Sequence, residues 1–238
     1  MKKIYYITAV FATLFLVGCG DGIDLPGVNV ETDLNKIPLP DNNVNLEQVE
    51  LKPSTEPMLH EGLHTEEDFQ RIRDKKAAGE EPWVSAYQLL VESQFSQKTA
   101  DTYPTEWIKR GISGDENYMN AARGATIVYQ QALRWKIEQD DEYAAKAVEN
   151  LNKWVQTCVG VTGNTNLSLA AGLYGYEFAI AGELLRDYGG WDRADFAAFQ
   201  NWLLKVFYPA NDDFLKRHHD TNALHYWANW CLCNIAAK

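Results

Sequence analysis

The sequence predicts an all-α protein built from antiparallel helix pairs. Apolar residues recur at helical spacing through most of residues 65–237, no segment alternates apolar and polar residues as a half-buried strand does, and no hairpin turn is recognisable. The chain has 238 residues, of which 46% are hydrophobic, which is enough for one sizeable core. We therefore expect a single folded domain of helices over residues 57–238.

The N-terminus is expected to be an export signal. Two lysines precede a short apolar stretch, a pattern typical of a signal peptide over residues 1–19. Its ending, LVGC, resembles a bacterial lipobox, which implies a lipid on Cys19; an ordinary signal with a chance cysteine is the alternative. We expect an exported lipoprotein of the periplasm or outer membrane, attached to the membrane through Cys19.

Residues 20–56 are rich in Asp, Asn, Pro and Gly and show no sustained periodicity, which predicts a flexible tether. The first helix follows Thr65, a good N-cap with Asp68 at the capping-box position, and continues until Gly79. Pro82 suits the first turn of the second helix. A polar loop is expected near 97–116. Further helices are expected over 118–139, 141–158, 167–188, 193–207 and from Asp220 or Thr221 to the end.

The composition limits the partners. A net charge of -11 makes nucleic acid an improbable partner. Eight tryptophans and twelve tyrosines are many for this length. Such aromatic residues fill cores, and they also form platforms that stack on sugar rings.

The spacing His60-Glu61-x-x-His64 matches a zinc motif when it lies on a helix. Here it precedes the N-cap Thr65 and contains Gly62, so we expect a loop and no zinc site. The cysteines form no metal-binding or disulfide framework by their spacing. No metal is predicted.

The segment FYPANDDFLKRHHDTNALHYWANW, residues 207–230, holds the densest group of functional side chains. Arg217 and His218 belong to a local basic cluster that can attract a polyanion. The alternative is a solvated loop, in which neighbouring aspartates balance these charges.

In a helix that begins at Asp220 or Thr221, four polar side chains would share one stripe, with Trp227 and Trp230 beside it. Polar groups on one face are costly to bury unless they are hydrogen-bonded or line a cleft. The stripe is compatible with a cleft and with a hydrogen-bonded polar cluster between helices. The stripe consists of Asn222, His225, Tyr226 and Asn229.

Four segments in this order resemble the alginate lyase superfamily of bacterial polysaccharide lyases: HEGLHTEEDFQRIRDKKAAGEEPW, YQQALRWKIEQDDEYAAKAVENLNKW, LAAGLYGYEFAIAGELLRDYGGW and FYPANDDFLKRHHDTNALHYWANW. The resemblance covers residues 60–237. It implies an (α/α) toroid, or an incomplete α/α barrel, of antiparallel helix pairs around a cleft for an acidic, uronic-acid-containing polysaccharide.

The resemblance implies β-elimination without a metal or another cofactor. An amide, helped by Arg or His, binds the uronate carboxylate and acidifies the proton on C5. A Tyr or His base removes this proton, and an acid protonates the departing O4. Charge that develops on the carboxylate requires fixed donors, and the base requires a suitable pKa.

Matched to the family, Asn229 is the expected carboxylate binder, and His225 and Tyr226 are the expected catalytic partners. The other expected substrate-binding residues line the same cleft. They are Asn222, Trp227, Trp230, Tyr129, Gln130, Arg217 and His218.

The chain also departs from the family pattern. Cys231 stands where relatives usually carry an acidic residue, and the family's later His, Arg and Tyr would lie beyond Lys238. We therefore expect the N-terminal half of a longer lyase, which could be inactive by itself. A non-catalytic glycan-binding lipoprotein and a helical scaffold lipoprotein are the alternatives.

Overall fold

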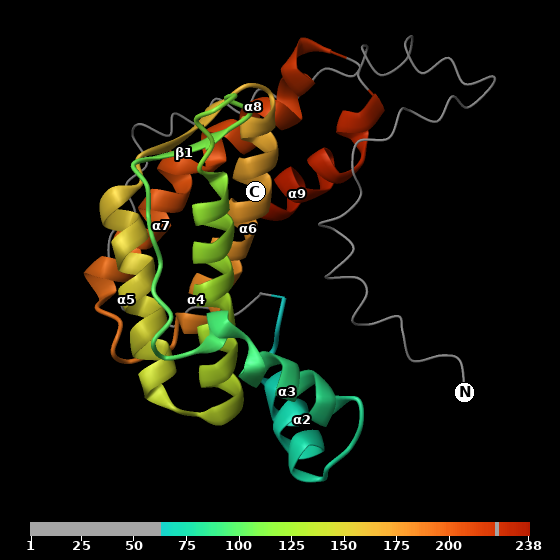
Figure 1. Cartoon of the computed structure of the whole chain (residues 1–238), viewed down its shortest axis with the longest axis vertical. Coiled ribbons are helices and arrows are strands. Elements are labelled where there is room, and N and C mark those ends of the chain that lie inside the picture. The colour runs from blue at the N-terminus through green and yellow to red at the C-terminus, as the bar shows by residue number, and fades with distance from the viewer. Residues whose placement is uncertain (1–62, 222–223) are drawn as a thin grey trace, which may run out of the picture.

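The computed structural model describes residues 63–221 and 224–238, and most of them are helical (Figure 1). The all-α prediction is confirmed for this part of the chain. The α-helices are α2 (Glu66–Ala77), α3 (Trp83–Glu92), α4 (Tyr118–Glu138), α5 (Asp141–Thr157), α6 (Asn166–Leu185), α7 (Arg193–Val206), α8 (Tyr208–Arg217) and α9 (Asn229–Ala237). Short 3-10 helices are η4 (Gln94–Ser96), η5 (His218–Asp220) and η6 (Leu224–Trp227).

Helices α4 and α6 run beside each other through the middle of the molecule, with α5 and α7 on one side and α9 on the other (Figure 1). Contacts between Thr126 and Glu177 and between Tyr118 and Tyr174 show that α4 and α6 point the same way. This parallel pair positions the side chains described below. No helix among the described residues is both long and apolar enough to span a membrane.

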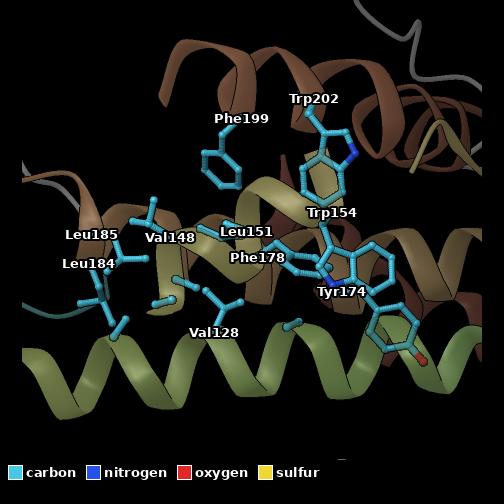
Figure 2. Packing of buried hydrophobic residues seen from close by; sticks show 14 of the residues in the cluster. Val128, Val148, Leu151, Trp154, Tyr174, Phe178, Leu184, Leu185, Phe199 and Trp202 are labelled. Carbon is cyan, nitrogen blue, oxygen red and sulfur yellow. The ribbon is translucent and has the colours of Figure 1, made fainter. Parts of the chain in front are cut away.

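Large aromatic side chains fill the space between these helices and α5 and α7 (Figure 2). Phe178 of α6 lies 5.4 Å from the ring of Trp154 and 5.2 Å from that of Trp202, in tilted and edge-on arrangements that aromatic pairs favour. Leu151 and Leu185 are fully buried beside them. Several of the tryptophans that are abundant in the sequence thus fill the core.

Two fully buried amides, Gln131 of α4 and Asn150 of α5, fasten the segment that follows η4. The Asn150 amide donates to the Ala100 carbonyl (3.0 Å) and to Gln131 (3.1 Å), and it accepts from the Thr102 N–H (3.2 Å). Gln131 donates to the carbonyls of Gln97 and Ala100. These hydrogen bonds satisfy the two buried amides and fix the backbone of the loop against α4 and α5.

A short parallel sheet was not expected from the sequence. Strand β1 (Trp107–Arg110) pairs with β2 (Gly160–Gly163), with Trp107 opposite Gly160. A Cβ on Gly160 would lie 2.5 Å from the Trp107 ring, so glycine is required at this close approach. Two further departures concern the C-terminal segment. Residues 208–217, to which no helix was assigned from the sequence, form α8, and the expected final helix is divided.

The start of α2 agrees with the prediction. Thr65 is its N-cap, and Thr65 and Asp68 form the complete capping box. His64 lies before the helix, as expected, and His60 and Glu61 lie outside the described residues.

Candidate functional site

Helices α4 and α6 begin close to β1 at one end of the molecule, and α9 packs along α6 (Figure 1). Trp230 in the first turn of α9 clusters with Leu169 in the first turn of α6, and Cys233 lies against Gly172 one turn further on. The first turns of α4, α6 and α9 hold no acidic residue, whereas those of α2, α5 and α7 do. The positive ends of these three helix dipoles are therefore available to an anion.

Arg110, at the end of β1, lies between two tyrosines at this end. Its guanidinium is 4.6 Å from the centre of the Tyr118 ring, and it donates to the Tyr174 hydroxyl at 3.4 Å. The two rings stack at 6.5 Å. Within the described part of the chain, no carboxylate lies at ion-pair distance from this guanidinium. Arginine of this kind suits bidentate binding of a carboxylate.

The environment around Arg110 sets the protonation state of Tyr174 and the hydrogen bonding of Glu116. Burial raises the pKa of Tyr174 to about 12, while the positive charge of Arg110 acts in the opposite direction. Tyr174 is therefore a neutral hydrogen-bond donor at neutral pH. The nearby Glu116 carboxylate accepts a hydrogen bond from the Gly111 N–H at 2.5 Å. The unit of Arg110, Tyr118 and Tyr174 supplies donors to an anion.

Asn229, the expected carboxylate binder, is the first residue of α9, and its side chain is exposed. It precedes Cys233 by about one turn, and the Arg110 charge acts on Cys233 by lowering its pKa against the larger, opposite effect of burial. Asn229 and Arg110 therefore belong to the same end of the molecule. The role expected for Asn229 stays a prediction.

The single stripe expected for Asn222, His225, Tyr226 and Asn229 is wrong. Residues Leu224–Trp227 form a 3-10 helix, and Ala228, with φ -107° and ψ -120°, separates it from α9. Spacing of three and four residues places side chains on one face only within an unbroken α-helix. Asn222 and the side chain of His225 lie outside the described part of the structure.

Tyr226 and Trp230, expected to line the cleft, are buried at 5% and 8% exposure. Their rings pack against Phe214 of α8 at 5.5 and 5.9 Å and against each other at 4.9 Å. His219 contacts the same cluster and lies 3.2 Å from the Ser168 hydroxyl. These contacts assign a packing role to both aromatic residues.

Trp227, in contrast, is 46% exposed, and its indole stacks on the His218 ring at 4.3 Å. The His218 Nε2 is 3.1 Å from the Cys231 sulfur. Burial, followed by the charge of His219, lowers the pKa of His218, so this imidazole is neutral at neutral pH. Trp227 and His218 together present a flat aromatic surface that a sugar can stack on.

Arg217 is less available than the sequence suggested. It makes two hydrogen bonds to Asp213, at 2.8 and 2.9 Å, and one to Asp220 at 2.8 Å. Lys216 pairs with Asp212 at 2.9 Å. The aspartates of this segment thus balance its cations, as in the alternative reading of the basic cluster.

Tyr129 and Gln130 lie further along α4. The Tyr129 hydroxyl is 2.7 Å from His64 Nε2, and Gln130 accepts a hydrogen bond from the Ser93 hydroxyl at 2.6 Å. Burial, and then the charges of Tyr176 and Glu177, raise the pKa of Tyr129, while burial lowers that of His64. A neutral phenol and a neutral imidazole therefore share this hydrogen bond, and the tautomer of His64 decides which of them donates.

Glu177 of α6 was missed by the sequence analysis. It accepts a hydrogen bond from the Thr126 hydroxyl at 2.9 Å, yet burial raises its pKa to about 7. A carboxyl group that titrates near neutrality is suited to proton transfer. Its position on the α4-facing side of α6, seven residues after Ala170, was the signal that could have identified it.

No group of three or more His, Cys, Asp or Glu residues within the described ranges is arranged to hold a metal ion.

Comparison with known families identifies the chain. The family model described as alginate lyase matches residues 72–237. The chain belongs to the alginate lyase family. No curated protein and no solved structure gives a significant match.

For this member of the alginate lyase family, the match contains Arg110, Tyr118, Tyr174 and Asn229, and it begins after His64. The family supports a polysaccharide lyase and an acidic polysaccharide substrate.

Proposed function

We propose that this chain belongs to a lyase that cleaves a uronic-acid-containing polysaccharide by β-elimination, at the end where α4, α6 and α9 begin. The observation that supports this proposal most is Arg110, which is held between Tyr118 and Tyr174 without a carboxylate partner in the described residues. We further propose that the helix pairs form part of an (α/α) toroid, to which the parallel direction of α4 and α6 contributes support.

The first step is to bind the uronate carboxylate. Arg110 and the exposed amide of Asn229 are the proposed donors, with the positive helix ends behind them. When the C5 proton leaves, negative charge moves onto this carboxylate. Donors that are already in place stabilise that charge more than they stabilise the ground state.

The second step transfers the protons. His225 is the proposed base, taken from the family resemblance, and it receives the C5 proton as the C4–O4 bond breaks. An acid group then protonates the departing O4. Tyr226 is a weaker candidate for either role because its side chain is buried among aromatic rings.

A non-catalytic glycan-binding protein is the second candidate function. Its specific support is that Tyr226 is buried, whereas Trp227 is exposed and stacked on His218 as a sugar platform would be. On either account, we propose that residues 1–19 direct export, that a lipid on Cys19 anchors the chain in the periplasm or at the outer membrane, and that residues 20–56 act as a tether.

Ultraviolet absorbance distinguishes the two candidates. β-Elimination creates a C4–C5 double bond conjugated to the carboxylate, so the absorbance should rise when the protein is mixed with alginate or another polyuronate. A neutral polysaccharide should give no change. Binding of the polyuronate without any rise in absorbance would reject the lyase proposal for this chain and favour the glycan-binding function.

A further inference from the structure

A hollow lies between α4 and the segment from η4 to Tyr103. Its volume is about 300 Å³, at the lower end of the range for small-molecule sites. Most of its lining residues carry a polar side chain, and Phe95 and Ile127 are among those that supply apolar surface. The polar lining residues that matter here are Gln94, Thr99, Tyr103, Asn120 and Arg123.

Helix α4 contributes one continuous stripe to this hollow: Asn120, Arg123, Gly124 and Ile127, at positions i, i+3, i+4 and i+7. Tyr118, which faces Tyr174 at the proposed lyase site, is five residues before Arg123. Five residues of α-helix turn by about 140° and rise about 7.5 Å, so Arg123 points to a different side of α4. The hollow is therefore distinct from the proposed lyase site.

Arg123 supplies the positive charge of the hollow. Its side chain is exposed, and no carboxylate in residues 63–221 and 224–238 lies at ion-pair distance from it. Asp101 also lines the hollow, but its carboxylate accepts hydrogen bonds from Lys146 at 2.7 Å and Lys153 at 2.9 Å. The hydrogen bonds from these two lysines, and then their positive charges, keep the pKa of Asp101 below its usual value. An anion in the hollow can therefore pair with Arg123, and the charge of Asp101 is already balanced by the two lysines.

The walls of the hollow are fixed before a ligand arrives. Gln131 and Asn150 hold the backbone at Ala100 and Thr102. The Thr102 hydroxyl accepts a hydrogen bond from the Trp154 indole at 2.5 Å, and Gly124 leaves room for this contact because a Cβ there would clash with it. A preformed wall lowers the entropy cost of binding.

We propose that this hollow is a second carbohydrate site, which binds one uronate residue. Arg123 binds the carboxylate, Gln94, Thr99 and Asn120 bind hydroxyl groups, and Tyr103, 74% exposed at the rim, stacks on the sugar ring. The ligand class rests on the proposed function. The site would hold the polymer without cleaving it.

The test is to follow the backbone amide signals of the ¹⁵N-labelled chain while sodium glucuronate is added. The signals of Thr99, Tyr103 and Gly124 should shift and saturate. Glucose lacks the carboxylate, and acetate lacks the sugar ring and its hydroxyl groups. Each should bind at least about tenfold more weakly than glucuronate, which is the scale of losing a charge-assisted contact. Because this titration needs no turnover, its outcome is independent of whether the chain is a lyase.

Arg123→Gln should weaken glucuronate binding at these amides by about tenfold or more. Two controls should leave it within about twofold: Arg110→Gln, at the proposed lyase site, and Arg193→Gln, which removes an exposed charge at the start of α7. Tyr103→Ala tests the stacking role separately. Unshifted amides, equal binding of acetate or glucose, or undiminished binding by a folded Arg123→Gln protein would each overturn the proposal.

Discussion

Asn150→Ala should destabilise the protein strongly, because the buried amide connects three parts of the fold. It donates to Ala100 and Gln131 and accepts from the Thr102 N–H, and its side chain has 0% exposure. Alanine leaves the Thr102 N–H and the Gln131 oxygen without this partner. Each buried polar group that loses its partner costs about 1–3 kcal/mol, so we expect a loss of about 2–6 kcal/mol.

Urea unfolding followed by circular dichroism measures this loss, with Asn152→Ala as the matched control. Asn152 is two residues further on in α5 and makes an exposed hydrogen bond to Asp195 at 3.1 Å. Its replacement should cost no more than about 0.5 kcal/mol. Equal midpoints for the two variants would refute the assignment of the buried amide cluster as the support of residues 97–102.

Four further predictions concern the site and the N-terminus. Arg110→Gln should lower kcat/KM on a polyuronate by at least about tenfold while far-ultraviolet circular dichroism stays unchanged; full activity would exclude Arg110 from substrate binding. Asn229→Ala should lower kcat by about 10²-fold, more than it alters KM; because Asn229 is exposed, an unfolded variant would show that its role is structural instead. Since burial raises the pKa of Glu177 to about 7, the folded state retains this proton longer, so its contribution makes stability fall as pH rises between about 4.5 and 7. Glu177→Gln should flatten that fall in thermal unfolding, and an unchanged pH profile would contradict the shift. Mass spectrometry of the exported protein should find an acylated N-terminal Cys19, and a retained signal peptide would reject lipidation.

The helices of this chain could be predicted from the sequence because their signals are local. Thr65 and Asp68 marked the start of α2, and the apolar spacing of α4 predicted residues 118–139, against an observed end at Glu138. Gln139 ends α4 in the left-handed conformation, and Asp140 immediately caps α5. Capping and periodicity act within one turn, so one sequence contains them.

The features that were missed depend on distant residues. Strand β1 exists because Trp107 and its neighbours pair with residues 53 positions later, and the pairing leaves no local alternation to recognise. The final segment fits helical spacing, yet His218, His219 and Asp220 all have positive φ, and the aromatic packing around Phe214 divides the segment. Local periodicity could not reveal these tertiary effects.

The same reasoning explains the outcome for the site. Asn229 was selected from the family resemblance; its side chain is exposed, and its role in binding the carboxylate stays a prediction. Arg110 could not be selected from the sequence, because it falls in a segment expected to be a loop, and only the fold brings Tyr118 and Tyr174, the latter 64 residues away, to its guanidinium. Glu177 is likewise defined by its burial against α4.

The central claim is that a polyuronate binds where α4, α6 and α9 begin, and mapping a bound oligouronate tests it most directly. Amide signals of the ¹⁵N-labelled chain should shift in β1 and in the first turns of these helices, including Arg110, Tyr118 and Asn229. Arg110→Gln should remove these shifts, while Arg193→Gln should not. Shifts that avoid this end of the molecule, or that persist in Arg110→Gln, would contradict the account.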